Sequence, residues 1–485
     1  MKRSVIILLL SLAATSAFAV DASEFAARRA RLAKELGPNA MLVVFSAKTA
    51  IRNNDVEYPF RQSDDLLYLT GIAQTETTLV MLPGESDFKE VIFTRERNPQ
   101  QELFTGKVLS NDEVTKISGI KQVYGAGRAR MFINSVALGG GQWPWPNDSV
   151  ERIPKRALPA FTEAVRAARA EVWLALVTRN AESEELQFAE ELRKRYPELV
   201  FRDAHQRIRA MREVKSAGEI ATLQRAVDIS VAAHKAAMKR ALTATNEAQV
   251  EATADFVVRE STCCWGYPPI VASGANATTL HYDVNNAPVD RKGLFLMDMG
   301  AEVDGYSCDV TRTFPASGKF SPDQRAVYDA VLAAQNAAIT AMKPGARLGD
   351  ADNAAIAVLG RELLKLGLTT KDDPRQVFMY FRHGIGHRIG LDVHDVWDRD
   401  RVAEPGMTFA IEPGVYVRKD DVLAMPAFTR LPKEEQDKIR AALDRYNGMG
   451  VRIEDDIVVT SGAPAIMSAA APRTSAEVEA WLASR

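Results

Sequence analysis

Short apolar runs alternate with amphipathic segments through the first part of the chain. The amphipathic stretch at residues 25–36 predicts a helix, and a tract rich in glycine and proline at residues 139–146 predicts a loop. The runs that predict buried strands are residues 40–45, 78–82, 91–94 and 172–176. Strands separated by helical segments indicate an α/β domain, which we assign to residues 21–208.

A capping box marks the start of the second half. Ser216 and Glu219 have the spacing at which a serine caps a helix and a glutamate bonds back to the serine backbone. The apolar residues that follow near helical spacing are Ile220, Leu223, Val227 and Val231. His234 lies on this predicted helix, and we interpret it as structural. We therefore place a domain boundary before the helix and assign residues 209–485 to a second domain.

Residues 294–315 predict a buried β-hairpin. Asp304 and Gly305 supply a two-residue turn between two arms that are rich in apolar residues. Counting outward from this turn places Asp298 opposite Thr311. Further along the chain, the pattern predicts helices near residues 324–342 and 350–366.

The hairpin register makes Asp298 and Asp309 diagonal neighbours on one face, with Cβ atoms about 7 Å apart. Aspartates on a hairpin more often belong to a solvated face, but the apolar arms indicate burial, and buried carboxylates are costly unless paired or bound to a metal. The pair therefore predicts nearby cations. By strand alternation Cys308 points to the other face, so we do not count it as a ligand. We interpret it, Cys263 and Cys264 as buried free thiols, with a disulfide between Cys308 and one of the adjacent pair as the alternative in an exported protein.

The amino-acid composition gives no support for a nucleic-acid or membrane-surface partner. The chain of 485 residues carries 63 acidic and 61 basic residues, so no excess of charge favours nucleic acid or an anionic membrane surface. Its length is sufficient for two domains with substantial cores. Apart from the start of the chain, no segment is apolar for long enough to cross a membrane.

Residues 1–19 have the pattern of a secretory signal peptide. Lys2 and Arg3 form the charged start, residues 5–12 are apolar, and small residues at positions 17 and 19 match a cleavage site. The apolar run is too short for a membrane anchor. We expect cleavage after Ala19 and a periplasmic or secreted mature protein.

Other candidate ligands lie in three short motifs. His383 and His387 have the spacing of helical zinc ligands, but the Gly-Ile-Gly between them disfavours a helix. A glycine-rich loop that brings its histidines close to a ligand, with His394 following, is the better interpretation. Glu412 ends a short apolar strand, and Glu454 lies within the apolar run at residues 451–459, where it shares a face with Arg452. An acid inside an apolar strand is unusual.

Taken together, these motifs predict a centre that contains two metal ions. Its members are Asp298, Asp309, His387, Glu412 and Glu454. Four carboxylates and one imidazole favour a hard or borderline cation such as Mn²⁺, with Co²⁺ or Zn²⁺ as alternatives. Their number exceeds what one ion with an open position needs, so two ions that share bridging carboxylates are the natural inference.

The motifs MDMG…CDVTRTFP, HGIGHRIGLDVHDV, IEPGVYV and VRIEDDIVV occur in this order and resemble the five-ligand signature of the pita-bread metallopeptidases. Nearly the whole mature chain is similar to aminopeptidase P, the Xaa-Pro aminopeptidase family, including residues 57–71 and 211–216. This resemblance implies an α/β N-terminal domain and an α+β pita-bread catalytic domain of the creatinase/aminopeptidase type.

The resemblance also implies roles for individual residues. The five ligands would be those named above, with Asp309 and Glu454 bridging the two ions and Glu412 shuttling a proton. The histidines that would surround the substrate and stabilise the tetrahedral intermediate are His281, His383 and His394. Tyr416 and Arg452 would support the ligands or line the substrate pocket.

The implied reaction is removal of the first residue from peptides with proline in second position, by attack of a hydroxide that bridges the metals. A prolidase that cleaves only Xaa-Pro dipeptides is an alternative, and a peptide-binding protein without catalysis is a weaker one because all five ligands are intact. The resemblance further implies a homodimer or homotetramer. Phe104 stands where some members carry a tryptophan that reaches a neighbouring subunit's site.

Overall fold

The structure is a computed structural model that describes residues 20–138, 158–176, 183–398 and 400–484. The predicted signal peptide at residues 1–19 and the predicted loop at residues 139–146 lie outside the described residues. No helix in the described part combines the length and the apolar character needed to cross a membrane.

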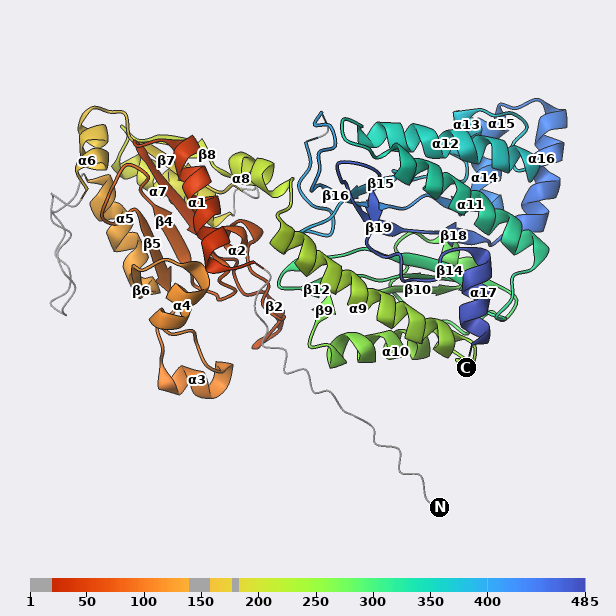
Figure 1. The fold of residues 1–485 in the computed structure, drawn as a ribbon, viewed down its shortest axis with the longest axis horizontal. Coiled ribbons are helices and arrows are strands. Elements are labelled where there is room, and N and C mark those ends of the chain that lie inside the picture. The colour runs from red at the N-terminus through yellow and green to blue at the C-terminus, as the bar shows by residue number, and fades with distance from the viewer. Residues whose placement is uncertain (1–19, 139–157, 177–182, 399, 485) are drawn as a thin grey trace, which may run out of the picture.

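The first half is built on a six-stranded sheet with the order β6-β5-β4-β1-β7-β8 (Figure 1). The strands are β1 (Ala40–Phe45), β4 (Thr78–Met81), β5 (Glu90–Thr94), β6 (Val123–Gly125), β7 (Glu171–Leu174) and β8 (Val200–Asp203). Strand β4 runs antiparallel to β1 and β5, whereas β7 runs parallel to β1 and β8. The four strands predicted in this region are confirmed, as is the α/β character.

Helices cover this sheet, and every residue of β1 is buried as a result. The helices of this half are α1 (Ala22–Leu36), α2 (Asp64–Thr70), α3 (Pro99–Thr105), α4 (Asn111–Ser118), α5 (Ala129–Ala137), α6 (Pro159–Arg166), α7 (Glu184–Arg195) and α8 (His205–Arg212). Helix α3 has no buried residue and lies apart from the sheet (Figure 1). A small hairpin of β2 (Ile51–Asn53) and β3 (Val56–Glu57) extends from the domain with all of its residues exposed.

The second half places short strands between two pairs of long helices (Figure 1). The helices of this half are α9 (Ala217–Ala241), α10 (Glu247–Glu260), α11 (Pro322–Ala341), α12 (Leu348–Lys365), α13 (Pro374–Val377), α14 (Lys419–Ala424), α15 (Pro426–Thr429), α16 (Lys433–Tyr446) and α17 (Ser475–Ala483). The predicted capping box of Ser216 and Glu219 is present at the start of α9. His234 is buried on α9, where its ring contacts the backbone oxygens of Ser230 and Met297, as a structural residue would.

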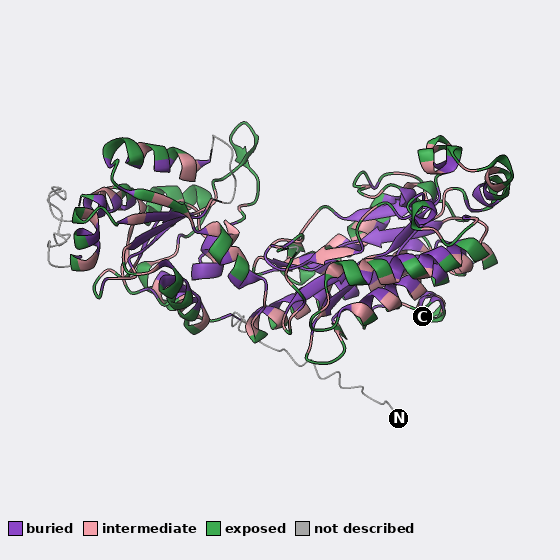
Figure 2. Cartoon of the chain, turned by 90° about the horizontal axis from the view of Figure 1, so that it is seen from above, coloured by how far each residue is buried: buried purple, intermediate pink, exposed green. Residues whose placement is uncertain are grey.

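The strands of this half form several small sheets, ordered β10-β11-β14, β13-β12-β9, β15-β16-β19-β20 and β17-β18. Their bounds are β9 (Cys264–Trp265), β10 (Ile270–Ser273), β11 (Leu294–Asp298), β12 (Ala301–Val303), β13 (Tyr306–Ser307), β14 (Thr311–Pro315), β15 (Gly386–Arg388), β16 (Thr408–Ile411), β17 (Gly414–Tyr416), β18 (Gly450–Arg452), β19 (Asp455–Val458) and β20 (Ala465–Ile466). Figure 2 shows that most of the strands are buried, while the helices expose their outer faces.

The predicted hairpin register is confirmed. Asp298 pairs with Thr311, and Val303 pairs with Tyr306 across the turn. Both turn residues have positive φ angles, 51° and 84°, which the Asp-Gly pair tolerates. The arms are not continuous strands, however, because each passes from one sheet to another, and residues 299–300 and 308–310 belong to no strand.

Two further expectations need correction. The apolar run at residues 451–459 is not one strand, because it breaks at Ile453 and Glu454 between β18 and β19. The break lets β18 pair with β17 while β19 pairs with β16. The expectation of buried thiols holds for Cys308, whereas Cys264 is exposed and Cys263 is half-buried, because they lie on the short strand β9 and just before it.

Candidate metal centre

Five acidic and imidazole side chains from separate segments meet in one place, which we call the five-residue centre. Its members are Asp298 at the end of β11, Asp309 just before β14, His387 in β15, Glu412 just after β16, and Glu454 between β18 and β19. Within the described residues, potential ligand atoms form overlapping triads whose atoms lie within 4.8 Å of one another. These triads are Asp309 with His387 and His394, His387 with Glu412 and Glu454, and Asp298 with Asp309 and Glu454.

The imidazole of His387 faces three of the carboxylates. Its Nε2 atom lies 3.4 Å from Asp309 Oδ2, 3.9 Å from Glu412 Oε1 and 3.9 Å from Glu454 Oε1. Glu454 is 1% exposed, and its Oε1 atom has no hydrogen-bond partner in the described protein. A buried carboxylate oxygen without a partner is costly, so this geometry fits a bound cation.

Burial and mutual repulsion raise the pKa of several acids in the centre. The pKa of Asp309 lies well above its ordinary value because the group is buried and faces Asp298. Burial, with Asp309 and Glu412 nearby, raises the pKa of Glu454 in the same direction. Burial also raises the pKa of Glu412 to about 7 although His387 opposes the shift. The centre therefore needs either protons or added positive charge.

Asp298 is the exception, because the positively charged side chain of Arg452 contacts it directly. Arg452 Nη2 donates to Asp298 Oδ2 at 2.5 Å, and both side chains are buried. Burial alone would raise the pKa of Asp298, but Arg452 and the hydroxyl of Tyr267 lower it below its ordinary value. One arginine thus balances one of the four carboxylates and leaves three.

Sequence reasoning missed three groups that hold the ligands in place. Tyr267 Oη lies 2.5 Å from Asp298 Oδ1 and 2.6 Å from Asp309 Oδ1, so its single proton lies between the two carboxylates. Asp456 Oδ2 accepts the backbone N–H of Asp309 at 3.0 Å, and Thr311 Oγ1 donates to Glu454 Oε2 at 2.7 Å. Asp456 lies two residues after the candidate ligand Glu454, and Thr311 belongs to the hairpin register, but no local pattern marks Tyr267.

A chain of hydrogen bonds orients His383. Arg452 Nη1 donates to Tyr416 Oη at 2.8 Å, and Tyr416 Oη lies 2.8 Å from His383 Nε2. The other ring nitrogen, Nδ1, lies 2.9 Å from the carbonyl oxygen of Gly384, which can only accept. Burial and the charge of Arg452 lower the pKa of His383 to about 4, so its ring is neutral near pH 7.

A cavity of about 620 Å³ opens onto the centre. The candidate residues that line it are Asp298, Asp309, His281, His383, His387, His394, Glu412 and Arg452. His281 is exposed, and the ring of His394 lies 4.1 Å from that of His387, centroid to centroid. Glu454 and Tyr416 do not line the cavity, but Glu454 lies beside His387 and Tyr416 lies beside His383. The structure thus brings every candidate residue into one region.

The lining beyond these groups is largely apolar, with Pro268, Ile270, Leu280 and Val393. Such a cavity is suited to a small organic molecule or peptide end that is held by a few polar groups. The donor set of carboxylates with one or two imidazoles suits divalent cations such as Mn²⁺, Co²⁺ or Zn²⁺. Together these features allow hydrolysis of a polar bond at a metal site.

Two family models match the chain. Residues 221–461 match metallopeptidase family M24, and residues 25–140 match the aminopeptidase P N-terminal domain. The first match covers all five residues of the centre, and the second covers most of the six-stranded sheet domain.

Curated relatives are similar over nearly their whole length. The Xaa-Pro aminopeptidase of Haemophilus influenzae is 31% identical over 469 residues, which is 94% of this chain and 96% of the relative. Xaa-Pro aminopeptidase 1 of Streptomyces coelicolor is 33% identical over 488 residues, which is 96% of this chain and 87% of the relative.

Solved structures agree with these matches. The aminopeptidase PepP of Pseudomonas aeruginosa has a TM-score of 0.79 and 31% identity, with 96% of this chain and 98% of that chain covered. Aminopeptidase P from Escherichia coli with the inhibitor Pro-Leu has a TM-score of 0.78 and 28% identity, with the same shares covered.

Proposed function

The chain belongs to the aminopeptidase P, or Xaa-Pro aminopeptidase, group of metallopeptidase family M24, and from this membership we propose that it hydrolyses peptides at a centre of two divalent metal ions. As a metallo-aminopeptidase of this group, it removes the first residue from peptides whose second residue is proline. The proposed ligands are Asp298, Asp309, His387, Glu412 and Glu454.

One observation carries the dinuclear proposal. The triads of close ligand atoms overlap, and Asp309 and Glu454 each belong to two of them. His387 also belongs to two triads, but it faces the acids with Nε2 alone. A carboxylate has two oxygens, so Asp309 and Glu454 would be the ligands able to hold both ions. The buried Glu454 Oε1 atom, which lacks a partner in the described protein, supports the same proposal.

Bound in this centre, two divalent cations would act as Lewis acids that activate a water molecule and polarise the scissile carbonyl. The protein's own groups supply the rest. His281 and His394 line the cavity beside the centre and are proposed to hydrogen-bond the carbonyl oxygen as negative charge develops on it.

His383 and Glu412 also line the cavity. Their side chains approach to 3.7 Å between His383 Nδ1 and Glu412 Oε2. The hydrogen bonds from Arg452 through Tyr416 hold the neutral His383 ring in a single orientation. We assign the proton shuttle to Glu412, which faces the cavity, and the positioning of His383 to Tyr416 and Arg452.

Several finer assignments belong to this proposal. We propose Mn²⁺ as the native metal, with Co²⁺ or Zn²⁺ as alternatives, because oxygen ligands dominate the centre. We also propose export through the signal at residues 1–19, a periplasmic or secreted location, and a division into domains at residues 21–208 and 209–485. A homo-oligomer is proposed as well, supported by Leu103 and Phe104, which are 84% and 90% exposed on α3.

Turnover by the purified protein from residue 20 onward tests the function. The substrates are an Xaa-Pro dipeptide, a matched peptide extended beyond the proline, and a control peptide with alanine in place of proline. Cleavage of the extended peptide that depends on Mn²⁺ and stops with chelator is the expected result. Cleavage of the dipeptide alone would identify a prolidase, and absence of cleavage despite bound metal would favour a peptide-binding protein.

A further inference from the structure

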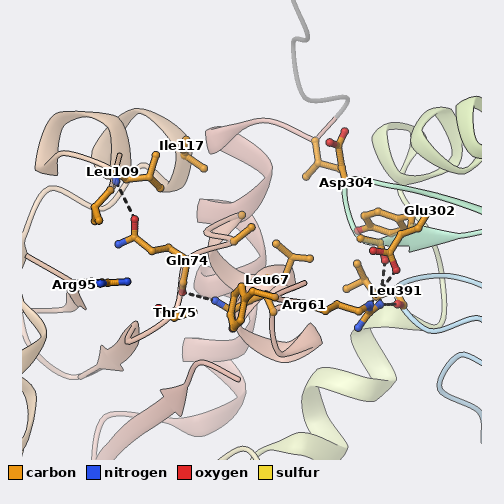
Figure 3. Close-up of a pocket in the computed structure, with 18 of the residues that line it drawn as sticks. Arg61, Leu67, Gln74, Thr75, Arg95, Leu109, Ile117, Glu302, Asp304 and Leu391 are labelled. Atoms are coloured by element: carbon orange, nitrogen blue, oxygen red, sulfur yellow. Dashed lines mark hydrogen bonds and ion pairs between the residues drawn. The ribbon is translucent and has the colours of Figure 1, made fainter. Parts of the chain in front are cut away.

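A second cavity lies where the two domains meet (Figure 3). Its volume of about 570 Å³ lies in the range of small-molecule sites. One wall comes from α1, α2, α4 and the segment 105–109 of the N-terminal domain, and the other comes from residues 302–306 at the hairpin tip and from Leu391. No residue of its lining also lines the cavity at the metal centre.

Most of this lining is apolar. The side chains that form the apolar surface include Phe25, Leu67, Leu109, Ile117 and Tyr306. Three of them, from α2, α4 and the segment after α3, are labelled around the cavity in Figure 3. Displacement of water from such a surface by an apolar molecule lowers the free energy and therefore favours binding.

Of the three basic groups in the lining, Arg61, Arg95 and Lys107, only Arg95 lacks a close ionic partner, because Arg61 and Lys107 each pair with an acid. The two acids of the lining are already paired, Glu302 with Arg61 at 2.9 Å and Asp304 with Arg225 at 3.2 Å. Arg95 has only long contacts, 3.7 Å from Nε to Glu76 Oε1 and 3.4 Å from Nη2 to Gln101 Oε1. Its guanidinium group can therefore take an anionic partner from a ligand.

Gln74 adds a hydrogen-bond donor without a partner. Its Oε1 atom accepts the backbone N–H of Leu109 at 2.8 Å, which sets the orientation of the amide. The Nε2 atom is then buried and has no hydrogen-bond partner among the described residues. In Figure 3 this nitrogen points to the side on which Arg95 lies. A buried donor left unpaired is costly, so an acceptor is missing at this end of the cavity.

We propose that this cavity is a second ligand site, which binds a small amphipathic anion. The apolar body of the ligand lies against Leu67, Leu109 and Ile117, and its carboxylate or sulfonate group lies at Arg95 and the amide of Gln74. The inference concerns binding alone, so it holds or fails independently of the proposed catalytic function.

Fluorescence titration of the metal-loaded protein with an anilinonaphthalene sulfonate dye tests the proposal. The neutral dye N-phenylnaphthylamine, which lacks the sulfonate, is the matched probe. R95Q is expected to weaken binding of the anionic dye by roughly tenfold or more, and to leave binding of the neutral dye within about twofold. R375Q, which changes an 85% exposed arginine outside the cavity, serves as the control and should leave both dyes unaffected.

Filling the cavity locates the site. L109W is expected to abolish binding of both dyes, whereas V393W, which fills the cavity at the metal centre, should leave binding intact. I117W is the second filling variant, in case L109W lowers the midpoint of thermal unfolding. Dye binding that survives both filling variants, that is lost in V393W, or that ignores R95Q would overturn the proposal.

Discussion

The five-residue centre and a second group of acids each gather four carboxylates, but an arginine contacts every acid of the second group and only Asp298 of the first. In this second group, which we call the Arg212 network, the acids are Asp64, Asp65, Asp392 and Asp395. Arg212 pairs with all four, at 3.3, 3.5, 2.8 and 2.7 Å, and Lys215 pairs with Asp395 at 2.7 Å.

The pKa values differ accordingly. Burial alone would raise the pKa of Asp395, but Lys215 and Arg212 lower it to about 2. In the five-residue centre, burial and neighbouring acids raise the pKa values of Asp309 and Glu454. Asp64 departs from its own network, because burial raises its pKa to about 8 despite the attraction of Arg212.

This difference in basic partners indicates that the Arg212 network is structural and that the five-residue centre is a binding site. The Arg212 network joins α2 and the end of α8 to the segment that carries Asp392 and Asp395, and its charges are largely satisfied within the protein. The five-residue centre has Arg452 for only one of its acids. Buried negative charge that the protein does not balance itself identifies the place for added cations.

Asp309→Asn should produce the largest effect, because it removes a proposed bridging ligand with little change in size. We expect loss of bound metal and a fall in kcat/KM of roughly a thousandfold or more, beyond the 10- to 100-fold that loss of an outer partner costs. Metal content by atomic absorption and turnover are measured together. Asp392→Asn, in the Arg212 network, should retain its metal; full activity in D309N would contradict the assignment.

Asp395→Ala should instead reduce stability. It leaves Lys215 and Arg212 buried without their closest partner, and breaking a buried ion pair in this way costs about 3 to 5 kcal/mol. Urea unfolding measures the loss, while the metal content of the folded protein should not change. Asp437→Ala breaks an exposed pair with Lys433 and should cost less than about 1 kcal/mol. An equal loss of unfolding free energy in the two variants would show that the Arg212 network contributes no more to stability than an exposed ion pair.

Tyr267→Phe sharpens the comparison within the centre. The hydroxyl of Tyr267 holds Asp298 and Asp309 together, so its loss should lower metal affinity about 10- to 100-fold and leave the fold intact. Metal titration measures the affinity. Tyr282→Phe is the matched control, because its hydroxyl bonds to Glu247 outside the centre. An unchanged affinity in Y267F would exclude this positioning role.

The smallest effect concerns acid stability. A carboxyl with a lower pKa in the folded than in the unfolded protein stabilises the fold above the unfolded value of about 4, and this contribution disappears as the pH falls toward 2. For Asp395, the stability advantage over Asp395→Asn should therefore shrink by about 1 kcal/mol between pH 6 and pH 3. Urea unfolding of both proteins at both pH values measures this difference in the free energy of unfolding. A difference that does not change with pH would show that Asp395 is not held ionised.

Local patterns predicted much of the fold. The four strands of the first half, the capping box of α9 and the hairpin register are all confirmed. Each depends on residues that are close in the chain, such as an Asp-Gly turn or a serine three residues before a glutamate. The motifs also predicted the family, because five short signatures in a set order rarely occur together by chance.

Local sequence patterns could not predict the contacts between segments that are distant in the chain. The break of the run at residues 451–459 depends on two partner strands, β17 and β16, which belong to different sheets. Tyr267 lies 31 residues before Asp298, and only the folded chain brings its hydroxyl to the two aspartates. The exposure of Cys264 depends likewise on where the short strand β9 lies.

The sequence by itself determined the short strand that ends at Glu412, the register that puts two aspartates on one hairpin face, and the family. Only the tertiary structure decided which carboxylates have basic partners and which do not. The reason is physical: balance of charge depends on distances of 3 to 4 Å between side chains more than 140 residues apart, as in Arg452 with Asp298 and Arg212 with Asp395. Such distances are set by packing and not by spacing along the chain.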